Sequence, residues 1–171
     1  MPLTSLTVVL HERRGVWARH LRPRLSAWPV RWAETRSSAD LESALAGLAC
    51  PIVVLDLVRR VRAGLEDLDR AVQRAPNAMV LVLDPEAHEG VAVLARELGA
   101  TQVISGVVTP PSVADLLARW LPLAQRQAES EGWSNAPPPA PEPEPWNWLA
   151  PLLRGPSVPL PLRLRTRAGR T

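Results

Sequence analysis

The chain has 171 residues and a formal net charge of +3; all 20 basic residues are arginine, and all seven aromatic residues are tryptophan. Its single cysteine excludes an internal disulfide framework and a cysteine-based zinc site, and no apolar run approaches the roughly 18 residues of a membrane span. No basic segment precedes the short N-terminal apolar run, so we expect a cytoplasmic protein without a signal peptide.

The composition changes sharply along the chain. Residues 1–133 contain 15 arginines and 15 acidic residues, whereas residues 134–171 contain five arginines, two glutamates and 10 of the 19 prolines. Proline-rich runs favour extended, semi-rigid backbone. We therefore predict a folded domain over 1–130, a linker over 134–145 and a tail over 146–171 that is disordered or docks onto a partner.

Short apolar runs alternate with segments of helical periodicity in the predicted domain. In chain order we predict a strand at 6–10, a helix at 14–25, a strand at 30–35, a helix from a cap at Ser37 or Ser38 to Leu48, a strand at 51–57, a helix at 64–75, a strand at 78–83, a helix at 88–98, a strand at 101–105 and a helix at 112–127. Strands that are apolar on both faces and separated by helices favour a parallel sheet covered on both sides. Right-handed crossovers then favour an α/β, flavodoxin-like (βα)5 sandwich of three layers with strand order 2-1-3-4-5.

Three features of residues 4–125 resemble the receiver domain of bacterial response regulators. Asp56 ends the third predicted strand, the place at which receivers carry their phospho-acceptor. Leu98-Gly99-Ala100 leads into the fifth predicted strand and is similar to the family's Gly-Ala turn. The third feature is the spacing of the five strand–helix units. The resemblance implies a CheY-like fold and a place in two-component signalling or a phosphorelay.

The resemblance also implies a magnesium site, from which this chain departs. Receivers carry two acidic residues after the first strand. The matching positions here are Leu10 and His11 or, one residue later, His11 and Glu12. Mg²⁺ prefers oxygen ligands, so Glu12 and Asp56 are the remaining candidates to hold it.

Two further family positions differ. Receivers place Ser or Thr after the fourth strand and Lys after the fifth, whereas this chain has Asp84 and Gly106 there and no lysine at all. The resemblance therefore indicates a degenerate pocket formed by His11, Glu12, Asp84 and Gly106, which is typical of a pseudo-receiver.

Two structural roles for Asp56 remain open. Backbone amides of the following loop can hold its carboxylate. Alternatively, an arginine of that loop (Arg59, Arg60 or Arg62) can fold back onto Asp56 or Asp84 and replace the missing lysine.

We expect a non-catalytic module that acts as a protein–protein interaction or signalling scaffold, independently of phosphorylation and without a cofactor. One alternative is a divergent receiver, phosphorylated on Asp56 by a histidine kinase, for which Mg²⁺ would be needed. A second is a nucleic-acid-associated protein that uses the arginine-rich tail. The neutral charge of residues 1–133 disfavours a nucleic-acid partner, because nucleic-acid binders usually carry a basic face on the fold itself.

Tryptophans are the predicted partner contacts. Trp120 lies on the last predicted helix, and receivers make contacts, including homodimers, through their last helices and last strand. Trp146, Trp148, Leu152 and Leu153 follow the proline-rich segment and have the composition of a docking peptide. The alternative for this cluster is that it covers an apolar patch of its own domain.

Overall fold

The computed structural model describes residues 6–134, with side chains as far as residue 130. Its elements are β1 (Leu6–His11), α1 (Val16–Arg24), β2 (Val30–Thr35), α2 (Ser38–Leu45), β3 (Ile52–Asp56), α3 (Val61–Arg74), β4 (Met79–Asp84), α4 (Val91–Glu97), β5 (Gln102–Ser105) and α5 (Pro110–Ser134). Apart from Ser134, the predicted linker at 134–145 and tail at 146–171 lie outside the described residues. No described helix is long and apolar enough to cross a membrane.

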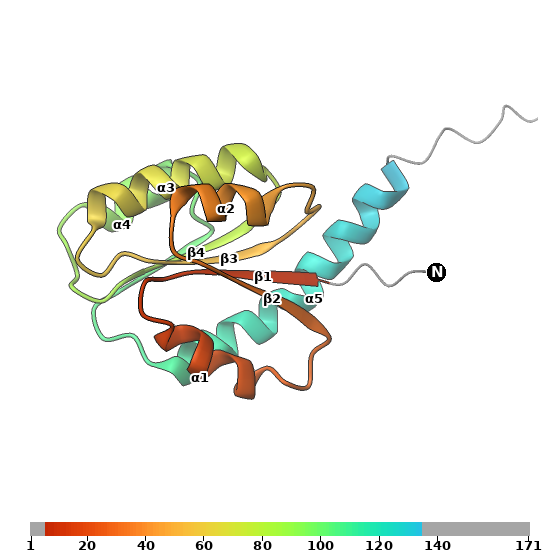
Figure 1. Cartoon of the computed structure of the whole chain (residues 1–171), viewed down its shortest axis with the longest axis horizontal. Helices are drawn as coiled ribbons and strands as arrows, with labels where there is room; N and C mark the ends of the chain where they lie inside the picture. The colour runs from red at the N-terminus through yellow and green to blue at the C-terminus, as the bar shows by residue number, and fades with distance from the viewer. Residues whose placement is uncertain (1–5, 135–171) are drawn as a thin grey trace, which may run out of the picture. The chain divides into compact units, whose positions relative to one another are not determined.

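The five strands form one parallel sheet in the order β2-β1-β3-β4-β5, which confirms the predicted fold class. Helices α1 and α5 cover one face, and α2, α3 and α4 cover the other (Figure 1). Strands β3 and β4 are buried on both faces because each face meets a helical layer.

Strand order places a crevice between two loops. The chain leaves β1 towards α1 on one face and leaves β3 towards α3 on the other (Figure 1). The loops after neighbouring strands therefore diverge, and in open parallel sheets such a switch point is where ligands bind. Helix α3 packs closely against Leu57 beside this point. The close approach requires Gly64, because a Cβ there would collide with the Leu57 side chain.

The helices differ from their predicted bounds by a few residues; α2 ends at Leu45 rather than Leu48, and α3 begins at Val61 rather than at residue 64. Helix α4 begins at Val91 rather than at residue 88, because His88 is held in a turn by Asp84 and Gly90 adopts a left-handed φ of 74°. Helix α5 continues past residue 127, and Pro122 does not end it. Leu121 and Ala124 are fully buried around that proline, so packing outweighs its local cost.

Candidate functional site

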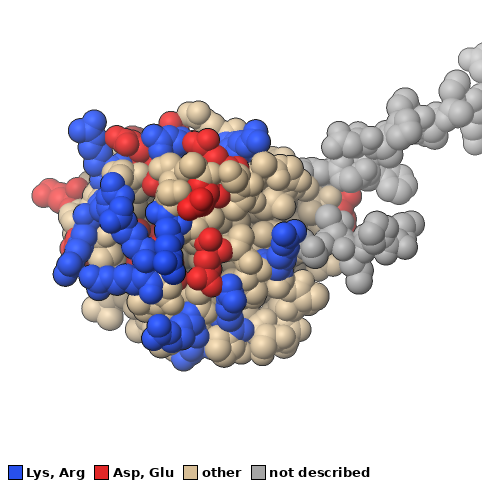
Figure 2. Space-filling view, viewed as in Figure 1, with Lys and Arg blue, Asp and Glu red and all other residues tan. Residues whose placement is uncertain are grey.

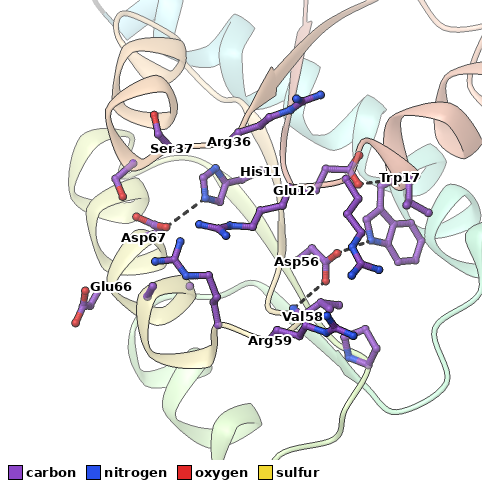
Figure 3. Close-up of a pocket in the computed structure, with 18 of the residues that line it drawn as sticks. His11, Glu12, Trp17, Arg36, Ser37, Asp56, Val58, Arg59, Glu66 and Asp67 are labelled. Carbon is purple, nitrogen blue, oxygen red and sulfur yellow. Dashed lines mark hydrogen bonds and ion pairs between the residues drawn. The ribbon is translucent and has the colours of Figure 1, made fainter.

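A pocket of about 690 Å³ opens at the C-terminal ends of β1 and β3 (Figure 3). The structure brings His11, Glu12 and Asp56 together around it. Asp84 and Gly106 do not line this pocket. The four residues expected to form one degenerate pocket therefore lie at two separate sites.

Asp56 is half-buried at the end of β3, and both of its carboxylate oxygens accept hydrogen bonds. The indole N–H of Trp17 lies 3.2 Å from Oδ2, and the backbone N–H of Val58 lies 3.2 Å from Oδ1. Burial raises the pKa of Asp56, and these two donors oppose that rise only in part. The Val58 contact confirms the interpretation that the next loop's backbone holds this carboxylate.

The alternative role for the loop arginines is wrong for the described residues. None of the arginines within residues 6–130 forms an ion pair with Asp56 or Asp84, and Arg62 pairs with Glu66 at 3.1 Å instead. Trp17, rather than an arginine of the loop after β3, is the side chain that donates to Asp56. Its position in the first turn of α1 did not predict this bond, because a tryptophan there is equally expected to pack in the core.

Glu12 is bound to the helix that follows it. Its side chain is only 5% exposed, and its oxygens accept the backbone N–H groups of Trp17 at 2.9 Å and Ala18 at 2.7 Å. Gly15, at the N-cap of α1, has no side chain that could hold these amides. The Glu12 carboxylate therefore serves as the cap of α1.

The side chain of His11, at the end of β1, bridges β2 and α3. Its Nδ1 lies 2.9 Å from Oγ1 of Thr35, its register partner on β2, and its Nε2 lies 3.2 Å from Oδ2 of Asp67 on α3. An ionised carboxylate only accepts, so Nε2 donates a hydrogen bond to Asp67, and the Thr35 hydroxyl also lies 3.4 Å from the Leu10 carbonyl oxygen, to which it donates. Burial lowers the pKa of His11, although Asp67 opposes that shift. Arg70 completes the network with a 3.0 Å hydrogen bond to Asp67.

Asp67, which is 6% exposed on α3, was not predicted as a pocket residue. An acidic residue between Leu65 and Leu68, both on the buried face of that helix, was the signal that could have found it.

The second site, formed by Asp84 and Gly106, lies at the ends of β4 and β5. The carboxylate of Asp84 is fully buried and accepts from the backbone N–H of His88 at 2.8 Å, while its other oxygen lies 2.7 Å from Nδ1 of the same residue. The backbone N–H of Gly106 donates to the Asp84 carbonyl at 2.9 Å. Gly106 has a φ of 85°, which L-residues rarely adopt, so this turn disfavours the lysine found in receivers.

The two predicted magnesium ligands take part in other bonds. Each carboxylate of Glu12 and Asp56 accepts two N–H donors, which leaves fewer of its lone pairs for a cation. Among the described residues, no group of three or more His, Cys, Asp or Glu side chains could hold a metal ion.

The prediction that Trp120 contacts a partner is wrong for the described fold. Trp120 is only 7% exposed and packs in the core formed by α1, α5 and the sheet, where it supplies the bulk that no Phe or Tyr is present to supply. The other predicted contacts, Trp146, Trp148, Leu152 and Leu153, lie outside the described residues.

Comparison with family models and with curated proteins finds no match. Solved structures do match. A CheY-like response regulator receiver domain protein from Methanospirillum hungatei is 14% identical over 74% of this chain and 98% of its own, with a TM-score of 0.59. A Burkholderia pseudomallei response regulator, solved with a phosphorylated aspartic acid, is 21% identical over 77% of this chain and 75% of its own, with a TM-score of 0.54.

The same fold occurs in a Burkholderia thailandensis protein named for pilus assembly (20% identity, 67% of this chain, 96% of that chain, TM-score 0.53). These likenesses agree with the strand order and helix layers described above. The described part of this chain has the fold of a response-regulator receiver domain.

Proposed function

We propose that this chain is a signalling module of the receiver type that does not accept a phosphoryl group and acts by binding another protein. The observation that carries this proposal is the bonding of Asp56, whose two carboxylate oxygens accept the Trp17 and Val58 N–H groups. The residue at the acceptor position is thereby a structural link between α1, β3 and the loop after β3.

The surroundings of Asp56 support the same conclusion. Phosphoryl transfer gathers negative charge, which enzymes and receivers offset with a metal ion and a cation. Here the Glu12 carboxylate caps α1, the chain has no lysine, and the backbone of Gly106 disfavours one.

Exposed apolar side chains on the last elements support a role in binding a partner. Val93 and Leu94 on α4 are 59% and 44% exposed, and Val107, after β5, is 95% exposed. They take the place of Trp120 as the candidate apolar contacts, and Leu94 lines a groove between α3 and α4. We expect them to meet another protein or a second copy of this chain.

The test of the proposal is intact mass spectrometry of the full chain after incubation with acetyl phosphate and Mg²⁺. The wild type is compared with Asp56→Ala, and an established receiver treated in parallel shows that the phosphoryl donor is active. We expect no phosphoryl adduct on either form of this chain. An adduct on the wild type that Asp56→Ala lacks would establish a divergent phospho-accepting receiver and overturn the proposal.

The contact surface has a separate test. Sedimentation of the full chain, wild type against Leu94→Asp, reports whether α4 joins two copies. A dimer that dissociates in Leu94→Asp identifies a second copy as the partner, whereas a monomer in both directs the search to a different protein.

A further inference from the structure

The pocket beside Asp56 has an uncompensated positive charge. Six arginines and four carboxylates line it, which leaves an excess of two positive charges with His11 neutral. Five of these arginines form neither an ion pair nor a side-chain hydrogen bond with any described residue. They are Arg13, Arg14, Arg36, Arg59 and Arg60.

Each carboxylate of the pocket already accepts hydrogen bonds from other groups. Glu12 is held by the α1 amides, Asp56 by Trp17 and Val58, Asp67 by His11 and Arg70, and Glu66 by Arg62. Like charges that gather without partners repel one another, and an anion from outside relieves that repulsion.

The five arginines come from three loops that meet at one edge of the sheet. Arg13 and Arg14 follow β1, Arg36 follows β2, and Arg59 and Arg60 follow β3. In Figure 2 the blue side chains gather at the left of the molecule, the side on which β1 ends in Figure 1. This edge includes the switch point between β1 and β3, where open parallel sheets bind ligands.

Local backbone geometry adds to the site. Arg59 has a φ of 61°, which non-glycine residues seldom adopt, at the loop that leads into α3. Helix α3 begins just after it, and the side chain of its N-cap residue, Arg60, makes no capping bond. The positive end of a helix thus lies beside the arginine cluster.

We propose that this pocket binds a small molecule that carries two or more linked phosphate groups, without covalent transfer and without a metal ion. Guanidinium groups bind phosphate oxygens in pairs of parallel hydrogen bonds, and several arginines on different loops can hold successive phosphates. A pocket of about 690 Å³ is within the range of small-molecule sites. The described arginines form a concave cluster, and residues 1–133 are neutral overall, so the observations favour a small anion over a nucleic-acid strand.

This inference goes beyond the proposed function and does not depend on it, because the arginines and not Asp56 hold the ligand. Isothermal titration calorimetry of the full chain, in EDTA and at constant ionic strength, tests it with inorganic triphosphate and with ATP. The pocket variant is Arg59→Gln with Arg60→Gln. The matched control is Arg119→Gln with Arg126→Gln, which removes the same charge from α5, outside the pocket.

We expect saturable binding to the wild type and to the control, and at least about a tenfold loss of affinity in the pocket variant. If the pocket variant does not fold, Arg13→Gln with Arg36→Gln takes its place, with the same expectation. Equal affinity for the two ligands would identify the phosphate chain as the recognised group. Tighter binding of ATP would show that the pocket also contacts the nucleoside.

Three results would overturn the inference. The first is the absence of saturable binding to folded wild type by either ligand. The second is an equal loss of affinity in the control variant, which would indicate general charge attraction. The third is binding of a single-stranded oligonucleotide with no binding of triphosphate. Unchanged intact mass after the titration separates this binding from phosphorylation of Asp56.

Discussion

The indole nitrogen of Trp17 lies 3.2 Å from Oδ2 of Asp56, and this bond joins the first turn of α1 to the end of β3. The same tryptophan gives its backbone N–H to Glu12. One residue therefore engages both acidic side chains that the sequence offers for phosphoryl chemistry, and it orients both towards structural roles.

Removing the indole donor tests this link. We expect Trp17→Phe to lower the free energy of unfolding by about 1 kcal/mol, because a hydrogen bond to a half-buried carboxylate is lost while most of the packing remains. We also expect the pKa of Asp56 to rise further, since this N–H group favours the ionised form. Urea denaturation of Trp17→Phe, Asp56→Ala and the double variant measures the coupling, and additive effects would contradict the link.

The burial of Asp56 predicts a pH dependence. Its folded pKa lies above the unfolded value, so the folded state binds the proton more tightly and stability falls as pH rises from the unfolded value through the folded one. Asp56→Asn removes this contribution. The stability of Asp56→Asn relative to wild type should therefore be greater at about pH 7 than at about pH 4. A difference that is constant across this range, measured by urea denaturation, would contradict the raised pKa.

His11 predicts the opposite dependence. Its folded pKa lies below the unfolded value of about 6.5, so its contribution to stability falls as pH drops through the unfolded value and towards the folded one. We expect His11→Gln to flatten the stability profile of the wild type between about pH 7 and pH 5. The control is His20→Gln, which replaces a histidine on α1 that does not line the pocket. An NMR titration of the imidazole protons measures the pKa directly.

The cap of α1 predicts a clear contrast between two glutamates. Glu12→Ala leaves two helix amides without their acceptor in a buried place, and we expect a loss of about 1–3 kcal/mol. Glu66→Ala removes only an exposed ion pair to Arg62, for which we expect about 0.5 kcal/mol or less. Similar losses in the two variants would show that Glu12 is not a cap.

Gly106 predicts the outcome of restoring the family's lysine. A left-handed backbone costs an L-residue roughly 1–2 kcal/mol, and asparagine tolerates it better than lysine. We therefore expect Gly106→Lys to be less stable than Gly106→Asn. Thermal unfolding of the two variants makes the comparison, and equal stabilities would show that the turn accepts any side chain.

The sequence was a good guide to the sheet because each strand carries its own signal. Ile52–Asp56 and Met79–Asp84 are apolar on both faces, and this local pattern is sufficient to predict buried parallel strands. The strand order then follows from crossover handedness. Helix ends were less predictable, because the start of α4 depends on the side-chain bond between Asp84 and His88.

The side-chain partners of the pocket could not be predicted in the same way. His11 and Asp67 are 56 residues apart, and only the packing of α3 against the sheet brings them together. The burial of Trp120 likewise depends on how α5 lies against α1, which no local pattern encodes. An aspartate at the end of the third strand predicted the position of the pocket. Its hydrogen-bond donors, Trp17 and Val58, became known only from the three-dimensional structure.

The bridge from His11 to Thr35 and Asp67 has a consequence for recognition. It connects β1, β2 and α3 beneath the arginine loops, and Asp67 is in turn fixed by Arg70. The floor of the pocket is thus preorganised in the free protein, and an arriving ligand has to immobilise only the arginine side chains above it. Loosening this floor at Thr35 should slow association, whereas loss of a single guanidinium should hasten release.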